Sequence, residues 1–177
     1  MTSVPVGIEY LDGPRLRTSL IAAADWLDAG REELNRINVF PVPDGDTGTN
    51  FASTLRAVAE AVRRLGPAPL PAVAKTMAEA SIFSARGNSG MLLSQFLLGF
   101  KETVDNKDTA SAGDVARAIR AGADRLHQSL DDPVEGTILT VAREAAAEAE
   151  RAVLETANFE EVMGRVLSHA EETLQKT

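Results

Sequence analysis

The sequence predicts an all-α domain, and three observations lead to this fold class. Ala and Leu are abundant, whereas aromatic residues make up only 5% of the 177 residues. Over most of the chain, apolar side chains recur three or four positions apart, which is the spacing of one face of an α-helix. Gly, Pro and Asp gather between these periodic segments, where helices start and stop. The periodic segments number about eight, and none reads convincingly as a strand.

Local signals set the expected bounds of each helix. Gly13-Pro14 opens the first helix and Gly30 ends it, because Pro is favoured in a first turn and Gly just past a last one. Thr49 or Asn50 is expected to cap the third helix, and Ser111 or Asp114 to start the sixth. The expected helices are 13–29, a short turn at 31–37, 49–65, 71–83, 91–104, 111–130, 137–156 and 158–177.

Composition excludes several classes of function. The formal net charge of −8 argues against a nucleic-acid partner, which requires clustered Lys and Arg. The absence of cysteine excludes disulfides, thiolate metal sites and a cysteine nucleophile. Zinc is not expected, because His127 and His169 are far apart on helical patterns, where surface or satisfied structural roles are the expectation. No signal-peptide pattern and no apolar run of about 20 residues is present, so we expect a cytoplasmic location.

The first loop, residues 38–50, carries two carboxylates one residue apart between prolines and glycines. Asp44 and Asp46 can converge on one cation in an extended or turning backbone, and hard oxygen ligands suit Mg²⁺ or Ca²⁺. The alternative is a solvated turn, because Asp-Gly pairs are common turn formers. An EF-hand beginning at Asp44 is rejected, because Thr49 stands at its sixth position and Leu55 at its twelfth.

A second loop (84–90) and a third loop (131–136) also stand directly before predicted helices. Free backbone N–H groups and the helix dipole make such positions candidate phosphate sites. The second loop is the better candidate, because its glycines admit close approach of an anion, Ser89 adds a hydroxyl and Arg86 adds charge. An ordinary turn remains the alternative for the Gly-Asn-Ser-Gly run. The Walker A spacing, the nucleophile elbow, the kinase signatures and the Rossmann fingerprint are all absent.

Taken together, the three motifs resemble the DAK2 domain, the nucleotide-binding domain shared by the L part of dihydroxyacetone kinase and the ATP-binding subunit of bacterial fatty acid kinase. The resemblance rests on Asn38 to Asn50, on Ser84-Ala85-Arg86-Gly87-Asn88-Ser89-Gly90-Met91-Leu92-Leu93-Ser94-Gln95, and on Pro133-Val134-Glu135-Gly136-Thr137-Ile138-Leu139-Thr140-Val141. It covers nearly the whole chain, as a single domain over 1–177. The family fold that it implies is an antiparallel barrel of eight amphipathic helices with the nucleotide and metal site at one end.

The resemblance also implies site residues. Asp44 and Asp46 match metal-binding aspartates that act in catalysis by holding two Mg²⁺ ions on the phosphates of ATP, and Asn38 stands at the third metal position. The residues implied to bind ATP or ADP are Thr47, Thr49, Asn50, Arg86, Asn88, Ser89, Gly90, Gly136 and Thr137.

Two departures from the dihydroxyacetone kinase branch favour the fatty acid kinase branch. Asn38 replaces an aspartate, and Thr47 stands where that branch commonly has a histidine. The resemblance thus implies transfer of the γ-phosphoryl group of ATP to the carboxylate of a fatty acid that a separate lipid-binding protein presents. In that branch the domain leads a longer chain, and the apolar period here continues almost to Thr177 without a stop signal. The alternatives are a dihydroxyacetone kinase L-type subunit and a nucleotide-sensing or interaction domain without its own turnover.

Overall fold

The computed structural model describes residues 7–39 and 43–177. In these residues it contains eight helices: α1 (Gly13–Ala29), α2 (Arg31–Arg36), α3 (Thr47–Leu65), α4 (Leu70–Ser84), α5 (Gly87–Val104), α6 (Ala112–Gln128), α7 (Ile138–Glu155) and α8 (Phe159–Leu174). The predicted all-α class is therefore confirmed. No helix of the described residues has the length and apolar character needed to cross a bilayer.

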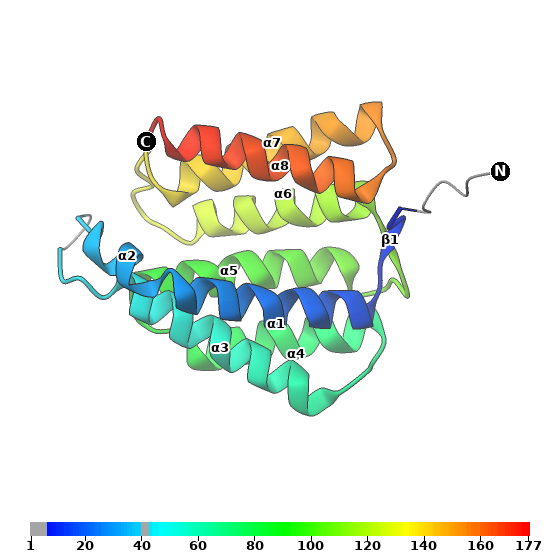
Figure 1. The fold of residues 1–177 in the computed structure, drawn as a ribbon, viewed down its shortest axis with the longest axis horizontal. Helices are drawn as coiled ribbons and strands as arrows, with labels where there is room; N and C mark the ends of the chain where they lie inside the picture. Colours follow the sequence, from blue (N-terminus) through cyan, green and yellow to red (C-terminus); the bar gives the residue numbers. More distant parts are fainter. Residues whose placement is uncertain (1–6, 40–42) are drawn as a thin grey trace.

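Apart from the short α2, successive helices run in opposite directions, so that α3, α5 and α7 all begin at the end of the molecule where α1, α4 and α6 finish (Figure 1). Helix α1 packs on α3 and α4, α4 packs on α5, and the chain then continues through the pairs α5–α6, α6–α7 and α7–α8. Extensive packing of α1 against α8 is not among these pairs. The antiparallel arrangement is thus present, and closure of the helices into a barrel stays a prediction.

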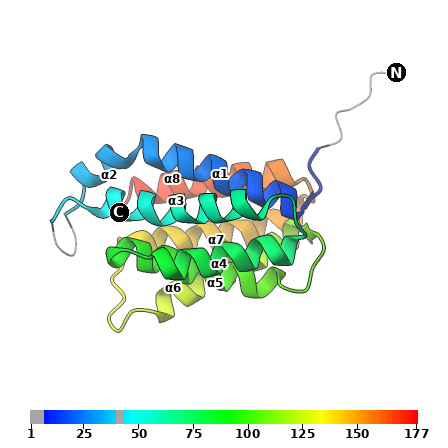
Figure 2. The same cartoon turned by 90° about the horizontal axis from the view of Figure 1, so that it is seen from below.

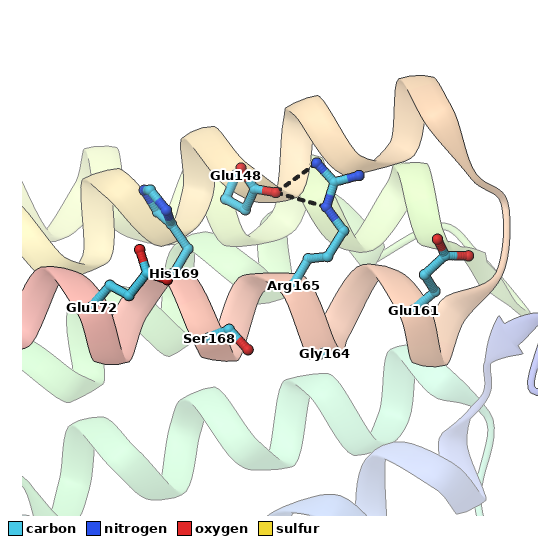
Figure 3. Close-up of a pocket in the computed structure, with 7 residues that line it drawn as sticks. All are labelled: Glu148, Glu161, Gly164, Arg165, Ser168, His169 and Glu172. Carbon is cyan, nitrogen blue, oxygen red and sulfur yellow. Dashed lines mark hydrogen bonds and ion pairs between the residues drawn. The ribbon is translucent and has the colours of Figure 1, made fainter.

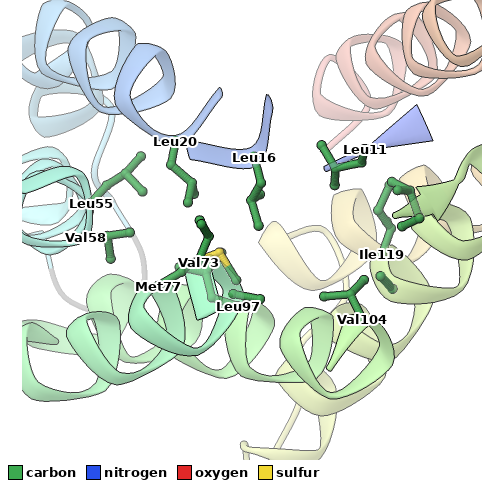
Figure 4. Packing of buried hydrophobic residues seen from close by; sticks show 14 of the residues in the cluster. Leu11, Leu16, Leu20, Leu55, Val58, Val73, Met77, Leu97, Val104 and Ile119 are labelled. Carbon is green, nitrogen blue, oxygen red and sulfur yellow. The ribbon is translucent and has the colours of Figure 1, made fainter. Parts of the chain in front are cut away.

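One hydrophobic core joins the helices (Figure 4). Leu16 and Leu20 of α1 meet Val58 of α3 and Val73 and Met77 of α4, and Val58 and Val73 are completely buried. Full burial of such a side chain stabilises the fold by about 1.5–3 kcal/mol. The core therefore fixes the helices whose first turns carry the predicted functional loops.

Two helices start earlier than the sequence predicts. Helix α3 begins at Thr47, two residues before the expected cap Thr49, with Asp46 in the N-cap position. Helix α5 begins at Gly87, so its first turn includes Asn88, Ser89 and Gly90, which were expected to form a loop. Glycine and asparagine weaken the local helix signal, and contacts with α3 described below outweigh it.

The expectation of no strand is wrong in one place. β1 (Tyr10–Leu11) pairs antiparallel with β2 (Ala110–Ser111), immediately before α6. Segments of two residues show no alternation, and this pairing joins positions about a hundred residues apart, so the pattern gives no sign of it. Ser111 caps α6 as predicted, in a reciprocal box with Asp114.

Candidate functional site

The three predicted loops lie at the same end of the molecule (Figures 1 and 2). The first precedes α3, the second joins α4 to α5, and the third joins α6 to α7. This common location follows from the alternating helix directions. Residues 40–42, within the first loop, lie outside the described residues.

Asn38 connects the two ends of the first loop. Its Nδ2 donates a hydrogen bond to Asp44 Oδ1 at 3.2 Å, and its Oδ1 accepts one from the Thr47 hydroxyl. In this geometry the amide nitrogen, not the carbonyl oxygen, faces Asp44. A metal-binding role for Asn38 therefore requires its amide to turn, whereas its bridging role is direct.

Asp44 and Asp46 are both exposed. Asp46 makes no side-chain hydrogen bond to the start of α3 although it occupies the N-cap position, and it forms no ion pair with any described residue. The cap is supplied instead by Asn35 of α2, whose Oδ1 accepts from the Thr49 backbone N–H at 3.0 Å and whose Nδ2 donates to Thr49 Oγ1 at 3.0 Å. The Thr49 hydroxyl thus faces α2. Sequence reasoning missed Asn35, since no motif marks a cap that comes from another helix.

The first and second loops are in direct contact. The Ser89 hydroxyl donates to the Thr47 carbonyl oxygen at 3.2 Å. A Cβ added to Gly87, whose φ is 58°, would come within 2.4 Å of Asn50 Nδ2. A Cβ on Gly90 would come within 2.5 Å of Thr54 Oγ1. The positive φ favours glycine at position 87, and both close approaches bring the first turns of α3 and α5 together.

Arg86 stands at the N-cap position of α5 and is exposed. Its guanidinium makes no hydrogen bond or ion pair with the part of the chain that the structure describes, unlike those of the other arginines, and its backbone carbonyl accepts the Gly90 N–H at 3.0 Å. Asn88, in the first turn of α5, is also exposed. An unpaired guanidinium beside two helix N-termini is suited to bind an anion, because its planar donors match phosphate oxygens.

The third loop is organised by its own side chains. Gly136, with φ 76°, donates its N–H to Thr140 Oγ1 at 2.9 Å, and the Thr137 hydroxyl donates to the Val134 carbonyl oxygen at 2.7 Å. Hydrogen bonds from Thr140 and from Arg143 lower the pKa of Glu135. Between the described residues, no hydrogen bond joins this loop to the other two. Gly136 and Thr137 therefore share the end of the molecule with Asp44 and Ser89 without a hydrogen bond to them.

The donor set at the first loop fits Mg²⁺. Two exposed carboxylates provide hard oxygens, and Mg²⁺ usually takes one or two carboxylates and completes its shell with water and phosphate oxygens. The described residues contain no group of three or more His, Asp or Glu side chains arranged to hold a metal by themselves. The site therefore fits a metal that arrives with a nucleotide better than one held by the protein alone.

A surface pocket of about 430 Å³ lies along α8, outside the three loops (Figure 3). Glu148 of α7 lines it and pairs with Arg165 of α8, at 2.8 Å. Burial alone would raise the pKa of Glu148, but hydrogen bonds from Arg151 and Arg165 outweigh it and lower that pKa. His169 also lines the pocket; its buried Nε2 has no hydrogen-bond partner among the described residues and lies 3.7 Å from a carboxylate oxygen of Glu144. His127 is exposed, as expected.

Comparison with known proteins identifies the family of this chain. The chain is 37% identical over 170 residues to an uncharacterised protein of Staphylococcus saprophyticus, 96% of this chain and 31% of that protein. It is 35% identical over 172 residues to the protein YloV of Bacillus subtilis, and this match covers 97% of this chain and 31% of that protein. The chain thus spans about a third of the length of these relatives. The DAK2 domain family model matches residues 41–177. This chain belongs to the DAK2 domain family, the nucleotide-binding family of the dihydroxyacetone kinase L-type domains.

Proposed function

We propose that this domain binds ATP with Mg²⁺ at the end that carries the three loops, and that it transfers the γ-phosphoryl group to a fatty acid carboxylate presented by a separate lipid-binding protein. One observation carries the nucleotide part of this proposal. The exposed carboxylates of Asp44 and Asp46 directly precede α3, and the first turn of α3 contacts that of α5 through Thr47 and Ser89. A polyphosphate with its cation requires acidic groups and anion-binding N–H groups side by side.

Each residue has a role that follows from its chemistry. Asp44 and Asp46 hold the cation, and the free N–H groups at the start of α5, with Ser89, bind phosphate oxygens. Arg86 contributes a positive charge that no described side chain neutralises. Bound Mg²⁺ would offset the negative charge on the transferred phosphoryl group. The protein's contribution to catalysis is therefore positioning and electrostatic stabilisation.

A carboxylate acceptor agrees with the polar groups around the first loop. A fatty acid is already ionised at neutral pH, so its oxygen attacks without a general base. Thr47, at the position of a histidine in the dihydroxyacetone kinase branch, has its hydroxyl bonded to Asn38. A threonine in that position is a poor base, and this supports an acceptor that needs none.

A protein partner is supported by apolar side chains around the loops. Val39 of the first loop is 76% exposed, and Phe83, at the end of α4, is 90% exposed. Met91 and Val134, in or beside the second and third loops, are about half exposed. Exposed apolar groups that cluster around a site mark surfaces for association.

Calorimetry with ATP tests the nucleotide part. Wild type is expected to bind ATP with Mg²⁺ and to lose most affinity in excess EDTA, whereas Asp44→Asn and Asp46→Asn should show weak binding in both conditions. Arg64→Gln, which removes an exposed positive charge near the opposite end of α3, is the control. Equal binding heats in wild type and both aspartate variants would exclude this site.

A transfer assay tests the acceptor. The protein, in its full natural length, is incubated with γ-labelled ATP and either a fatty acid on a bacterial lipid-binding protein or dihydroxyacetone on its own binding partner. We expect label in the acyl phosphate. Label in the triose alone would favour a dihydroxyacetone kinase subunit, and Mg²⁺-dependent binding with no transfer to either acceptor would favour a nucleotide sensor.

A further inference from the structure

The residue in the N-cap position of α3 is not the residue whose side chain caps the helix. An aspartate in the N-cap position ordinarily accepts a hydrogen bond from the backbone N–H two or three residues later. Asp46 holds that position, but the N–H three residues later, at Thr49, is bonded to Asn35 Oδ1 instead. The side chain of Asn35 completes the arrangement by donating to Thr49 Oγ1.

Close packing of α2 on α3 allows Asn35 to cap α3 in place of Asp46. A Cβ added to Gly48 would come within 2.2 Å of the Arg31 carbonyl oxygen and 2.9 Å of Leu34 Cβ, and Gly48 is buried. Only a glycine at position 48 lets the short helix α2 lie directly on the first turn of α3. Asn35 thus reaches Thr49 from a fixed helix, and the same helix leads directly into the first loop.

We propose that Asn35 is a positioning residue for the metal site: it caps α3 in place of Asp46 and thereby leaves the Asp46 carboxylate available to a divalent cation. This inference rests on the proposed function, because the cation is the one that accompanies ATP. Without Asn35, the Thr49 N–H lacks a partner, and the Asp46 side chain is the nearest acceptor by sequence position. The cap and the cation then compete for one carboxylate.

Thermal unfolding of four proteins tests the exchange without any ligand: wild type, Asn35→Ala, Asp46→Ala and the double variant. Asp46→Ala should shift Tm little in the wild-type background, because Asp46 does not cap there. In the Asn35→Ala background the same change should lower Tm by a further 2–4 °C, roughly the effect of losing one cap. Asp44→Ala in both backgrounds is the matched control, and its effect should be the same in each.

Calorimetry with Mg²⁺ and ATP tests the consequence for binding. Asn35→Ala is expected to weaken Mg²⁺-dependent ATP binding about fivefold, which is the effect of giving up one capping interaction. Binding of ATP in EDTA should be unchanged. Asn35→Asp, which keeps an acceptor for the Thr49 N–H, should restore Mg²⁺-dependent affinity to at least the wild-type value. Should Asn35→Ala fail to fold, Asn35→Ser replaces it in both experiments.

Additive Tm changes in the four proteins would overturn the proposal, as would an Asn35→Ala variant with wild-type affinity for ATP in Mg²⁺. Different results would contradict the ATP–Mg²⁺ site and the capping role of Asn35. If wild type binds ATP equally with Mg²⁺ and with EDTA, the proposed function fails, and the metal role of Asn35 fails with it. A non-additive Tm cycle would then still show that Asn35 displaces Asp46 from the cap.

Discussion

The backbone of Gly87 lies so close to Asn50 that any side chain at position 87 would collide with the Asn50 amide. A Cβ at position 87 would be 2.4 Å from Asn50 Nδ2. The two residues come from different loops, 37 positions apart in sequence. This contact, with the hydrogen bond from Ser89 to Thr47, makes one site from two motifs.

Gly87→Ala should therefore damage both stability and binding. The added methyl meets Asn50, and the φ of 58° disfavours any residue with a side chain. We expect a loss of about 1–3 kcal/mol in the free energy of unfolding and at least tenfold weaker ATP binding. Urea unfolding and calorimetry measure the two effects. Gly164→Ala on α8 is the control: nothing lies within 4 Å of its added Cβ, so stability should rise slightly. Equal effects of the two substitutions would contradict the close approach.

Arg86→Ala should weaken ATP binding without destabilising the fold. The Arg86 guanidinium has no hydrogen-bond or ion-pair partner among the described residues, and the backbone bond from Gly90 to the Arg86 carbonyl is kept in the variant. A hydrogen bond to a charged group contributes about 1.5–3 kcal/mol, and we expect a tenfold or greater rise in Kd for ATP. Arg64→Ala, which removes an exposed cation near the opposite end of α3, should leave Kd unchanged. If Arg86→Ala instead lost as much free energy of unfolding as free energy of ATP binding, Arg86 would have a structural role.

Phe83→Ser separates nucleotide binding from transfer to a protein-bound acceptor. Phe83 is 90% exposed beside the second loop, and its loss should leave the fold and the Kd for ATP nearly unchanged. Transfer to a fatty acid on its carrier should fall severalfold, through a raised KM for the carrier. Leu154→Ser is matched to it, because Leu154 is 86% exposed and belongs to the last turn of α7, a helix that begins at the third loop. Equal transfer rates in both variants would remove Phe83 from the docking surface.

Asp114 gives the fold a defined response to acid. Burial alone would raise the pKa of Asp114, but hydrogen bonds from Lys107 and Ser111 outweigh it and hold that pKa well below its ordinary value. A depressed pKa stabilises the folded state above the unfolded-state value of about 3.9, and this contribution is lost as pH falls through and below that value.

Asp114→Asn should thus cost about 1–2 kcal/mol at pH 7, and the difference from wild type should shrink below pH 4. Urea unfolding at pH 7 and pH 3 measures both values. Asp108→Asn, at an exposed position nearby, should change neither. A difference that stays constant with pH would show that the carboxylate charge of Asp114 does not contribute.

The sequence by itself determined what depends on neighbouring residues. Gly30 and Gly66 end their helices where predicted, and Ser111 caps α6 with Asp114. Such signals work over one helical turn, so a linear pattern contains them. The membership of Asp44 and Ser89 in recognisable motifs also needed no structure, whereas their roles toward ATP and Mg²⁺ remain predictions.

Only the tertiary structure decided which of these groups meet. The early start of α5 depends on the fit of Gly87 and Gly90 against Asn50 and Thr54, which no local pattern encodes. The freedom of the Asp46 carboxylate depends on Asn35, which reaches Thr49 because Gly48 lets α2 pack on α3. In each case the deciding contact joins separate elements, and its geometry follows from the shared core that holds the helices in place.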